Sequence, residues 1–131
     1  MVLLQSSSAA VAAPNWDIGL GSPSGGQTPA EGAPSAPDGV TAMCASPTGN
    51  TAEVGWNAVS QATTSTIFYS TTSSTSGFAP AATGVVGTSW TSSGLASGDY
   101  WFEVAVSVGT YWTSPDSSAT AQLTITATDC T

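Results

Sequence analysis

Large apolar side chains occupy every second position of residues 100–107, and this alternation indicates a β-strand. The alternating apolar residues are Tyr100, Phe102, Val104 and Val106. Trp101, Glu103, Ala105 and Ser107 stand between or after them. Successive side chains of a strand point to opposite faces, so a period of two predicts a strand with one face in a core. The period differs from the 3.6 residues of an amphipathic helix.

The same alternation returns in shorter segments from residue 37 onward, separated by turn residues. We expect strands over 40–44, 52–56, 67–69 and 119–125, and a short edge strand at 85–86 before Trp90. Turn-forming segments recur about every 8–12 residues, as in small sandwiches, and no window has a helical period. The sequence therefore predicts one all-β antiparallel sandwich over residues 37–131.

Several of these segments resemble the fibronectin type III domain over about residues 36–128. The matching residues are Pro37 before the first strand, Trp56 closing the second, Ile67 and Tyr69 on the third, Gly94-Leu95-Ala96-Ser97-Gly98-Asp99-Tyr100 leading to Phe102 and Val104, and Ser114-Pro115 before the last. The resemblance implies a seven-stranded Ig-like sandwich with Trp56 central to its core. It also implies that the corner from Leu95 to Tyr100 fixes the crossover between the sheets.

The expected core combines these residues with further aromatic and aliphatic side chains of the strands. Its members are Trp56, Tyr69, Trp90, Leu95, Tyr100, Phe102 and Val104. Ser65 departs from the family pattern, because an aromatic residue usually stands at its position.

Residues 1–36 combine Ser, Ala, Gly and Pro without periodicity, which predicts an extended arm ahead of the sandwich. Within it, Trp16, Ile18 and Leu20 occupy alternating positions. This pattern suits an added strand or an anchor in a partner's groove. The alternative is that Trp16 folds back onto its own domain. The apolar start of the chain lacks positive charge and is soon interrupted by polar residues, so we expect no secretion signal.

The chain has no Lys, Arg or His and eight acidic residues, which gives a formal net charge of −8. Nothing can therefore neutralise phosphates, and neither nucleic-acid binding nor a polybasic membrane patch is expected. Without His the chain lacks the commonest general base, without Lys it lacks an amine for a Schiff base, and without Arg it lacks a cationic ligand for an oxyanion. We therefore expect no enzyme and no cofactor. The carboxylates are scattered without calcium-loop spacing, and we expect no metal site. No apolar run is long enough to insert into a membrane.

Cys44 and Cys130 are the only cysteines, and they are separated by 86 positions. That spacing fits neither a zinc site nor a redox-active pair. A disulfide between them would contribute about 4–5 kcal/mol by restricting the unfolded chain. The alternative is two unrelated thiols, one of them a small core residue.

Two pairs of aromatic residues are candidates for partner or ligand binding. Tyr111 and Trp112 lie in the predicted loop before the last strand, where exposed rings suit contacts with proteins or sugars. The alternative is that one of them covers the end of the core. Phe68 and Trp101 are expected on the outer face of one sheet, where an apolar patch marks a contact surface.

These observations favour a non-catalytic structural accessory protein of a virus particle. We expect a bacteriophage capsid decoration or tail component on the virion, anchored by its arm to a major capsid or tail protein or to copies of itself. One alternative is an extracellular or cell-surface module that binds carbohydrate or a host surface. Another is a secreted spacer or filament subunit whose arm complements a neighbouring sheet edge.

Overall fold

The computed structural model of the chain describes residues 33–46 and 48–131, which form an all-β structure. The predicted fold class is confirmed, because every regular element in these residues is a strand and every pairing is antiparallel. The strands are β1 (Thr41–Cys44), β2 (Ala52–Gly55), β3 (Thr64–Ser70), β4 (Ala79–Val85), β5 (Ser89–Thr91), β6 (Gly98–Val108), β7 (Trp112–Thr113) and β8 (Leu123–Ile125).

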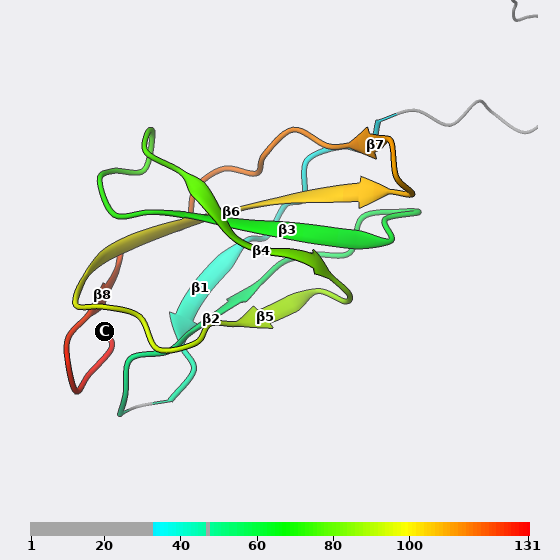
Figure 1. Cartoon of the computed structure of the whole chain (residues 1–131). Coiled ribbons are helices and arrows are strands. Elements are labelled where there is room, and N and C mark those ends of the chain that lie inside the picture. The colour runs from blue at the N-terminus through cyan, green and yellow to red at the C-terminus, as the bar shows by residue number, and fades with distance from the viewer. Residues whose placement is uncertain (1–32, 47) are drawn as a thin grey trace, which may run out of the picture. The chain divides into compact units, whose positions relative to one another are not determined.

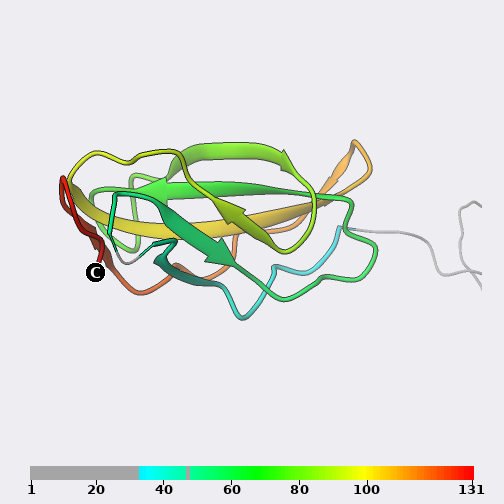
Figure 2. The same ribbon diagram turned by 90° about the horizontal axis from the view of Figure 1, so that it is seen from below.

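The strands form two sheets that enclose the core (Figure 1). The smaller sheet has the order β1-β2-β5, and the larger has the order β4-β3-β6. Both β7 and β8 pair with β6, at opposite ends of that long strand. Together they occupy the position of the single last strand that the seven-stranded prediction contained. Figure 2 shows the same two sheets from below, with β6 running along the length of the sandwich.

The core lies between the sheets and is built from alternate strand positions. As the alternation predicts, the inward residues of β6 are buried: Tyr100, Phe102, Val104 and Val106. Trp56 is also buried, whereas the other expected core residues, Tyr69, Trp90 and Leu95, are half-buried and pack against this cluster. The rings of Tyr69 and Tyr100 are 5.4 Å apart, and those of Tyr100 and Phe102 are 6.1 Å apart. The main apolar stabilisation therefore comes from a few large side chains.

The corner before β6 is fixed by polar contacts at Tyr100 and Leu95. The Tyr100 hydroxyl donates a hydrogen bond to the Ala96 carbonyl at 2.9 Å. Burial raises the pKa of Tyr100, and the neighbouring Tyr69 raises it further. The Leu95 backbone amide donates to the Asn50 carbonyl at 2.8 Å, and the Asn50 amide group donates back to the Leu95 carbonyl at 3.0 Å. These bonds tie the crossover to the turn before β2.

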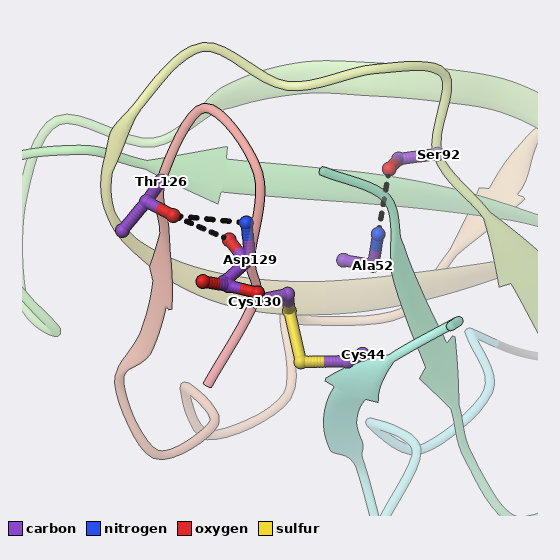
Figure 3. The surroundings of a disulfide bond; sticks show 6 residues. All are labelled: Cys44, Ala52, Ser92, Thr126, Asp129 and Cys130. Atoms are coloured by element: carbon purple, nitrogen blue, oxygen red, sulfur yellow. Dashed lines mark hydrogen bonds between the residues drawn. A yellow bond between two sulfur atoms is a disulfide. The ribbon is translucent and has the colours of Figure 1, made fainter. Parts of the chain in front are cut away.

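A disulfide joins Cys44, at the end of β1, to Cys130 near the C-terminus (Figure 3). Of the two alternatives left open by the sequence, the structure has the bridge, with a Cα–Cα distance of 5.5 Å. The Thr126 hydroxyl accepts from the Asp129 amide at 2.9 Å and donates to its carbonyl at 3.1 Å, which stabilises the turn after β8. The bridge thus connects the small sheet to the last segment of the chain.

Two strand predictions were wrong in their extent. The expected edge strand at 85–86 is the end of β4, which begins at Ala79, and Val86 lies outside it. This strand was missed because its Ala, Pro and Gly residues give no apolar alternation, although an edge position tolerates Pro80. The expected strand over 119–125 contains regular pairing only in β8, because residues 114–120 follow another pattern.

Residues 114–120 pair with β6 through hydroxyl groups placed at every third residue. Each of these residues donates its backbone amide to one β6 carbonyl and accepts, on its hydroxyl, the amide of the same β6 residue. The pairs are Ser114 with Val106, Ser117 with Val104, and Thr120 with Phe102. We call these residues the hydroxyl ladder. Three residues of this segment run alongside two residues of β6, a length of about 7 Å. The rise per residue of the segment is therefore smaller than that of a strand.

Candidate functional site

The β6–β7 hairpin presents the aromatic pair that the sequence analysis identified. Ser107 pairs with Thr113 and Val108 with Trp112, so Tyr111 lies in the connecting turn. Tyr111 is 88% exposed and Trp112 is 43% exposed, and neither belongs to the buried core. Trp112 begins a short strand rather than lying in a loop as predicted. Two large rings are therefore available for contact at one end of the sandwich, which we call the hairpin pole.

The hairpin is held against the loop before β3, which limits its movement. The Thr63 backbone amide donates to the Ser107 carbonyl at 2.8 Å, and the Thr63 hydroxyl donates to the same carbonyl at 3.1 Å. The Gly109 amide in turn donates to the Thr63 hydroxyl at 3.1 Å. Gly109 has a φ of 63°, a conformation that suits glycine in a tight turn. A hairpin that is already held in place by hydrogen bonds loses little conformational entropy when it binds a partner.

A cavity of about 180 Å³ opens at the same pole, between the two sheets. Its lining includes Trp56, Val59, Ser65 and Val106, with Val86 at one side. Ser65 is buried and lines the cavity, so a small side chain stands at the position where the resemblance to fibronectin type III domains implied an aromatic ring. Val86 is 79% exposed, so the rim of the cavity is apolar. This geometry can accept a small apolar group from a partner.

The N-terminal segment reaches the sandwich at the hairpin pole. Pro37 is buried, and the Asn57 backbone amide donates to the Asp38 carbonyl at 3.0 Å. The Asn57 side-chain amide donates to the Asp38 carboxylate at 2.8 Å. Asn57 belongs to the loop between β2 and β3, which also lines the cavity. Residues 37 and 38 are therefore fixed to the domain at the end that presents Tyr111 and Trp112.

A second concave surface lies on the side of the sandwich, between β4 and β5. It is an open groove of about 330 Å³ whose walls include Tyr69, Trp90, Leu95 and Tyr100. Ser92 also lines it, and its hydroxyl accepts the Ala52 backbone amide at 2.9 Å (Figure 3). The groove joins aromatic rings with hydroxyl and backbone groups, a combination that can bind a neutral polar ligand.

Phe68 and Trp101 share the outer face of the larger sheet, as predicted. Phe68 is opposite Glu103 in the β3–β6 register, and Ser70 is opposite Trp101, so the two aromatic residues are diagonal neighbours. Both are half-buried rather than fully exposed. They lie toward the opposite end of β6 from the hairpin, so the structure does not bring the two aromatic pairs into one site.

Metal and membrane features are absent from the part of the chain that the structure describes. Residues 33–46 and 48–131 contain no group of at least three His, Cys, Asp or Glu side chains placed to hold a metal ion. No helix among the same residues could cross a bilayer. The arm candidates Trp16, Ile18 and Leu20 lie outside the described residues.

Sequence reasoning missed the cavity, the side groove and the hydroxyl ladder. Ser65 was visible as a departure from the family pattern, and that departure was the available signal for the cavity. The ladder also had a signal, because Ser114, Ser117 and Thr120 repeat at a spacing of three. A spacing of three matches neither the two-residue period of a strand nor the 3.6-residue period of a helix. It therefore predicted no secondary-structure element.

Comparisons with known proteins support the sandwich assignment. No protein-family model matches the chain, and no curated protein matches it either. Among solved structures, an Fn3-like protein from Clostridium thermocellum is 28% identical, covering 69% of this chain and 88% of that one with a TM-score of 0.55. The fibronectin type III domain of human fibronectin type III domain containing protein 3 is 18% identical, covering 78% of this chain and 94% of that one with a TM-score of 0.52.

A further similarity is to titin kinase and its flanking domains, at 18% identity and a TM-score of 0.60. It covers 73% of this chain but only 18% of that one, so it concerns a single domain of a larger protein. All three similarities lie in the sandwich fold, and the resemblance stated from the sequence is confirmed. The described part of this chain is a fibronectin type III-like domain.

Proposed function

We propose that this protein is a non-catalytic structural accessory component of a virus particle, a capsid decoration or tail component that contacts its assembly through the hairpin pole. The observation that carries the proposal is the meeting of three features at that pole. The exposed rings of Tyr111 and Trp112, the cavity beside Val86 and the N-terminal connection all lie there. A single partner surface at this pole can therefore contact the rings and the cavity together.

Two further features fit a component that works outside the reducing cytoplasm. The Cys44–Cys130 disulfide is of a kind that persists in secreted proteins and on virion or cell surfaces. The chain also carries no cationic side chain, so copies of it repel one another unless a partner supplies positive charge. Both features favour a subunit attached to a larger, complementary assembly.

The test is incorporation into particles produced with the full-length chain. Tyr111→Ser with Trp112→Ser removes both rings from a surface hairpin, so the domain should keep its stability. We expect the amount of this double variant on purified particles to fall at least tenfold, measured by quantitative mass spectrometry. Met43→Ser is the matched control, because Met43 is 55% exposed but lies on the smaller sheet. Undiminished incorporation of the double variant, or absence of the wild type from particles, would refute the proposal.

A second candidate function, carbohydrate binding, is favoured by the side groove. Tyr69 and Trp90 contribute aromatic rings to it, and sugars bind proteins through ring faces combined with hydrogen bonds. A glycan array probed with the full-length chain tests this candidate, with Trp90→Thr as the groove variant. We expect binding of a neutral glycan that the variant loses. An array without wild-type binding would remove this candidate and leave the first one standing.

A further inference from the structure

The outer face of β3 and β6 combines aromatic side chains with the carboxylate of Glu103, which accepts no hydrogen bond from any residue in the described ranges. Phe68 is opposite Glu103 on β6 and opposite Pro80 on β4. Trp101 lies two residues before Glu103 on the same face of β6. We call Phe68, Pro80, Trp101 and Glu103 the β3–β6 patch. Apolar surface of this kind on a sheet face marks a contact surface.

Glu103 is half-buried beside Phe68 and Trp101, and its electrostatic environment is unfavourable. Burial raises the pKa of its carboxyl group, and the negative charge of Asp116 raises it further. No hydrogen bond between residues of the described ranges involves the Glu103 carboxylate, whereas the Asp38 and Asp99 carboxylates accept bonds from Asn57 and Thr124. A partly desolvated carboxylate without a partner costs free energy.

The chain itself cannot relieve this cost with a cationic side chain, because it contains no Lys, Arg or His. A cationic side chain beside Glu103 would therefore have to come from another molecule. Arginine fits the patch better than lysine, because its guanidinium is planar, is more weakly hydrated and can stack on an aromatic ring while it binds a carboxylate. Phe68, directly across from Glu103 on β3, and Trp101, two residues before it on β6, supply such rings.

We propose that the β3–β6 patch binds an arginine side chain on the surface of a partner protein, with the guanidinium paired to Glu103 and stacked on the neighbouring aromatic ring. Asp116 adds a second negative charge beside the site and increases its attraction for a cation. This inference rests on the proposed function only in requiring a protein partner. The patch and the hairpin pole are separate surfaces, and each is tested by its own variants.

The experiment titrates the full-length chain with acetyl-arginine amide and follows the NMR signals of the backbone amides and of the Trp indole N–H groups. Acetyl-lysine amide and the neutral acetyl-citrulline amide are compared at the same ionic strength. We expect saturable shifts at Trp101 and Glu103 with the arginine compound, weaker binding of the lysine compound and no shifts with citrulline. Shifts that spread over all carboxylates, or that fail to saturate, would overturn the proposal.

Glu103→Gln removes the charge while keeping the side-chain shape. We expect it to weaken arginine binding about tenfold, as loss of one charge-assisted contact predicts. Glu53→Gln is the matched control, since Glu53 is also half-buried within a strand but lies on the smaller sheet. Phe68→Thr keeps a strand-favouring residue and tests the aromatic contribution separately. Equal effects of the two Gln substitutions would also overturn the proposal, whatever the hairpin variants do.

Discussion

Removal of one hydroxyl from the ladder, by Ser117→Ala, should destabilise the domain through a single backbone amide. The Ser117 hydroxyl accepts the Val104 amide at 3.0 Å and donates to the Ser118 carbonyl at 2.9 Å. Val104 is fully buried and Ser117 is 6% exposed, so water cannot readily replace the lost acceptor. The Ser118 carbonyl belongs to an exposed residue and can bond to solvent instead.

A buried donor left without an acceptor costs about 1–3 kcal/mol, so we expect the free energy of unfolding to fall by about 2 kcal/mol. For a domain of this size the corresponding fall in Tm is about 10 °C. Urea denaturation at pH 7 measures the loss, with an unchanged m-value showing that the folded state is intact. Hydrogen exchange at the Val104 amide should become faster in the variant, because its local partner is gone.

Two control substitutions separate the hydroxyl from other effects. Ser118→Ala changes an exposed neighbour, and we expect a change within about 0.5 kcal/mol. Ser117→Thr retains the hydroxyl, as Thr120 does at the equivalent position of the ladder, and should keep most of the stability. If Ser117→Ala were as stable as Ser118→Ala, the Val104 amide would not depend on the Ser117 hydroxyl, and the ladder would be refuted as a stabilising element.

Three further predictions concern the bridge, the pH dependence and the corner. Replacing Cys44 and Cys130 by Ala should cost about 4–5 kcal/mol because the unfolded chain gains freedom, and an unchanged urea midpoint would contradict this. The raised pKa of Glu103 means that its ionisation opposes folding as pH rises through the range above 4.5. Glu103→Gln should therefore stabilise the domain at pH 7 and not at pH 3, and urea midpoints at the two pH values would show the difference. Tyr100→Phe removes the corner hydrogen bond and should cost about 1 kcal/mol, and no loss in thermal denaturation would argue against a stabilising corner.

The sequence predicted those parts of the fold that depend on a local period. Residues 100–107 alternate strictly, and β6 is the longest strand and buries the expected side chains. The bridge could not be decided in the same way, because 86 positions of sequence carry no information about distance in space. β4 was largely missed because Ala and Gly form its pairing without an apolar pattern. Its position is set by β3, which pairs with it despite two register shifts.

The candidate site could be predicted from the sequence only where the type of a single residue, such as a large aromatic side chain, already indicates a contact surface. Tyr111 lies in the turn and Trp112 directly after it, and exposed aromatic residues at a turn predict a contact surface. The cavity depends instead on Ser65 being small at a buried position, which has meaning only once the two sheets are assembled. The position of Glu103 beside Phe68 and Trp101 depends on the register of β3 and β6, which the linear sequence does not specify.

The absence of cationic side chains connects stability with binding at Glu103. In a chain with Lys or Arg, an internal ion pair could stabilise a half-buried carboxylate, but here a cationic side chain can come only from another molecule. Glutamine at this position should therefore stabilise the isolated domain and weaken its hold on an arginine. Opposite signs for the two effects are expected of a residue that serves binding at the expense of stability. A carboxylate that is merely tolerated on the sheet would instead change stability without changing affinity.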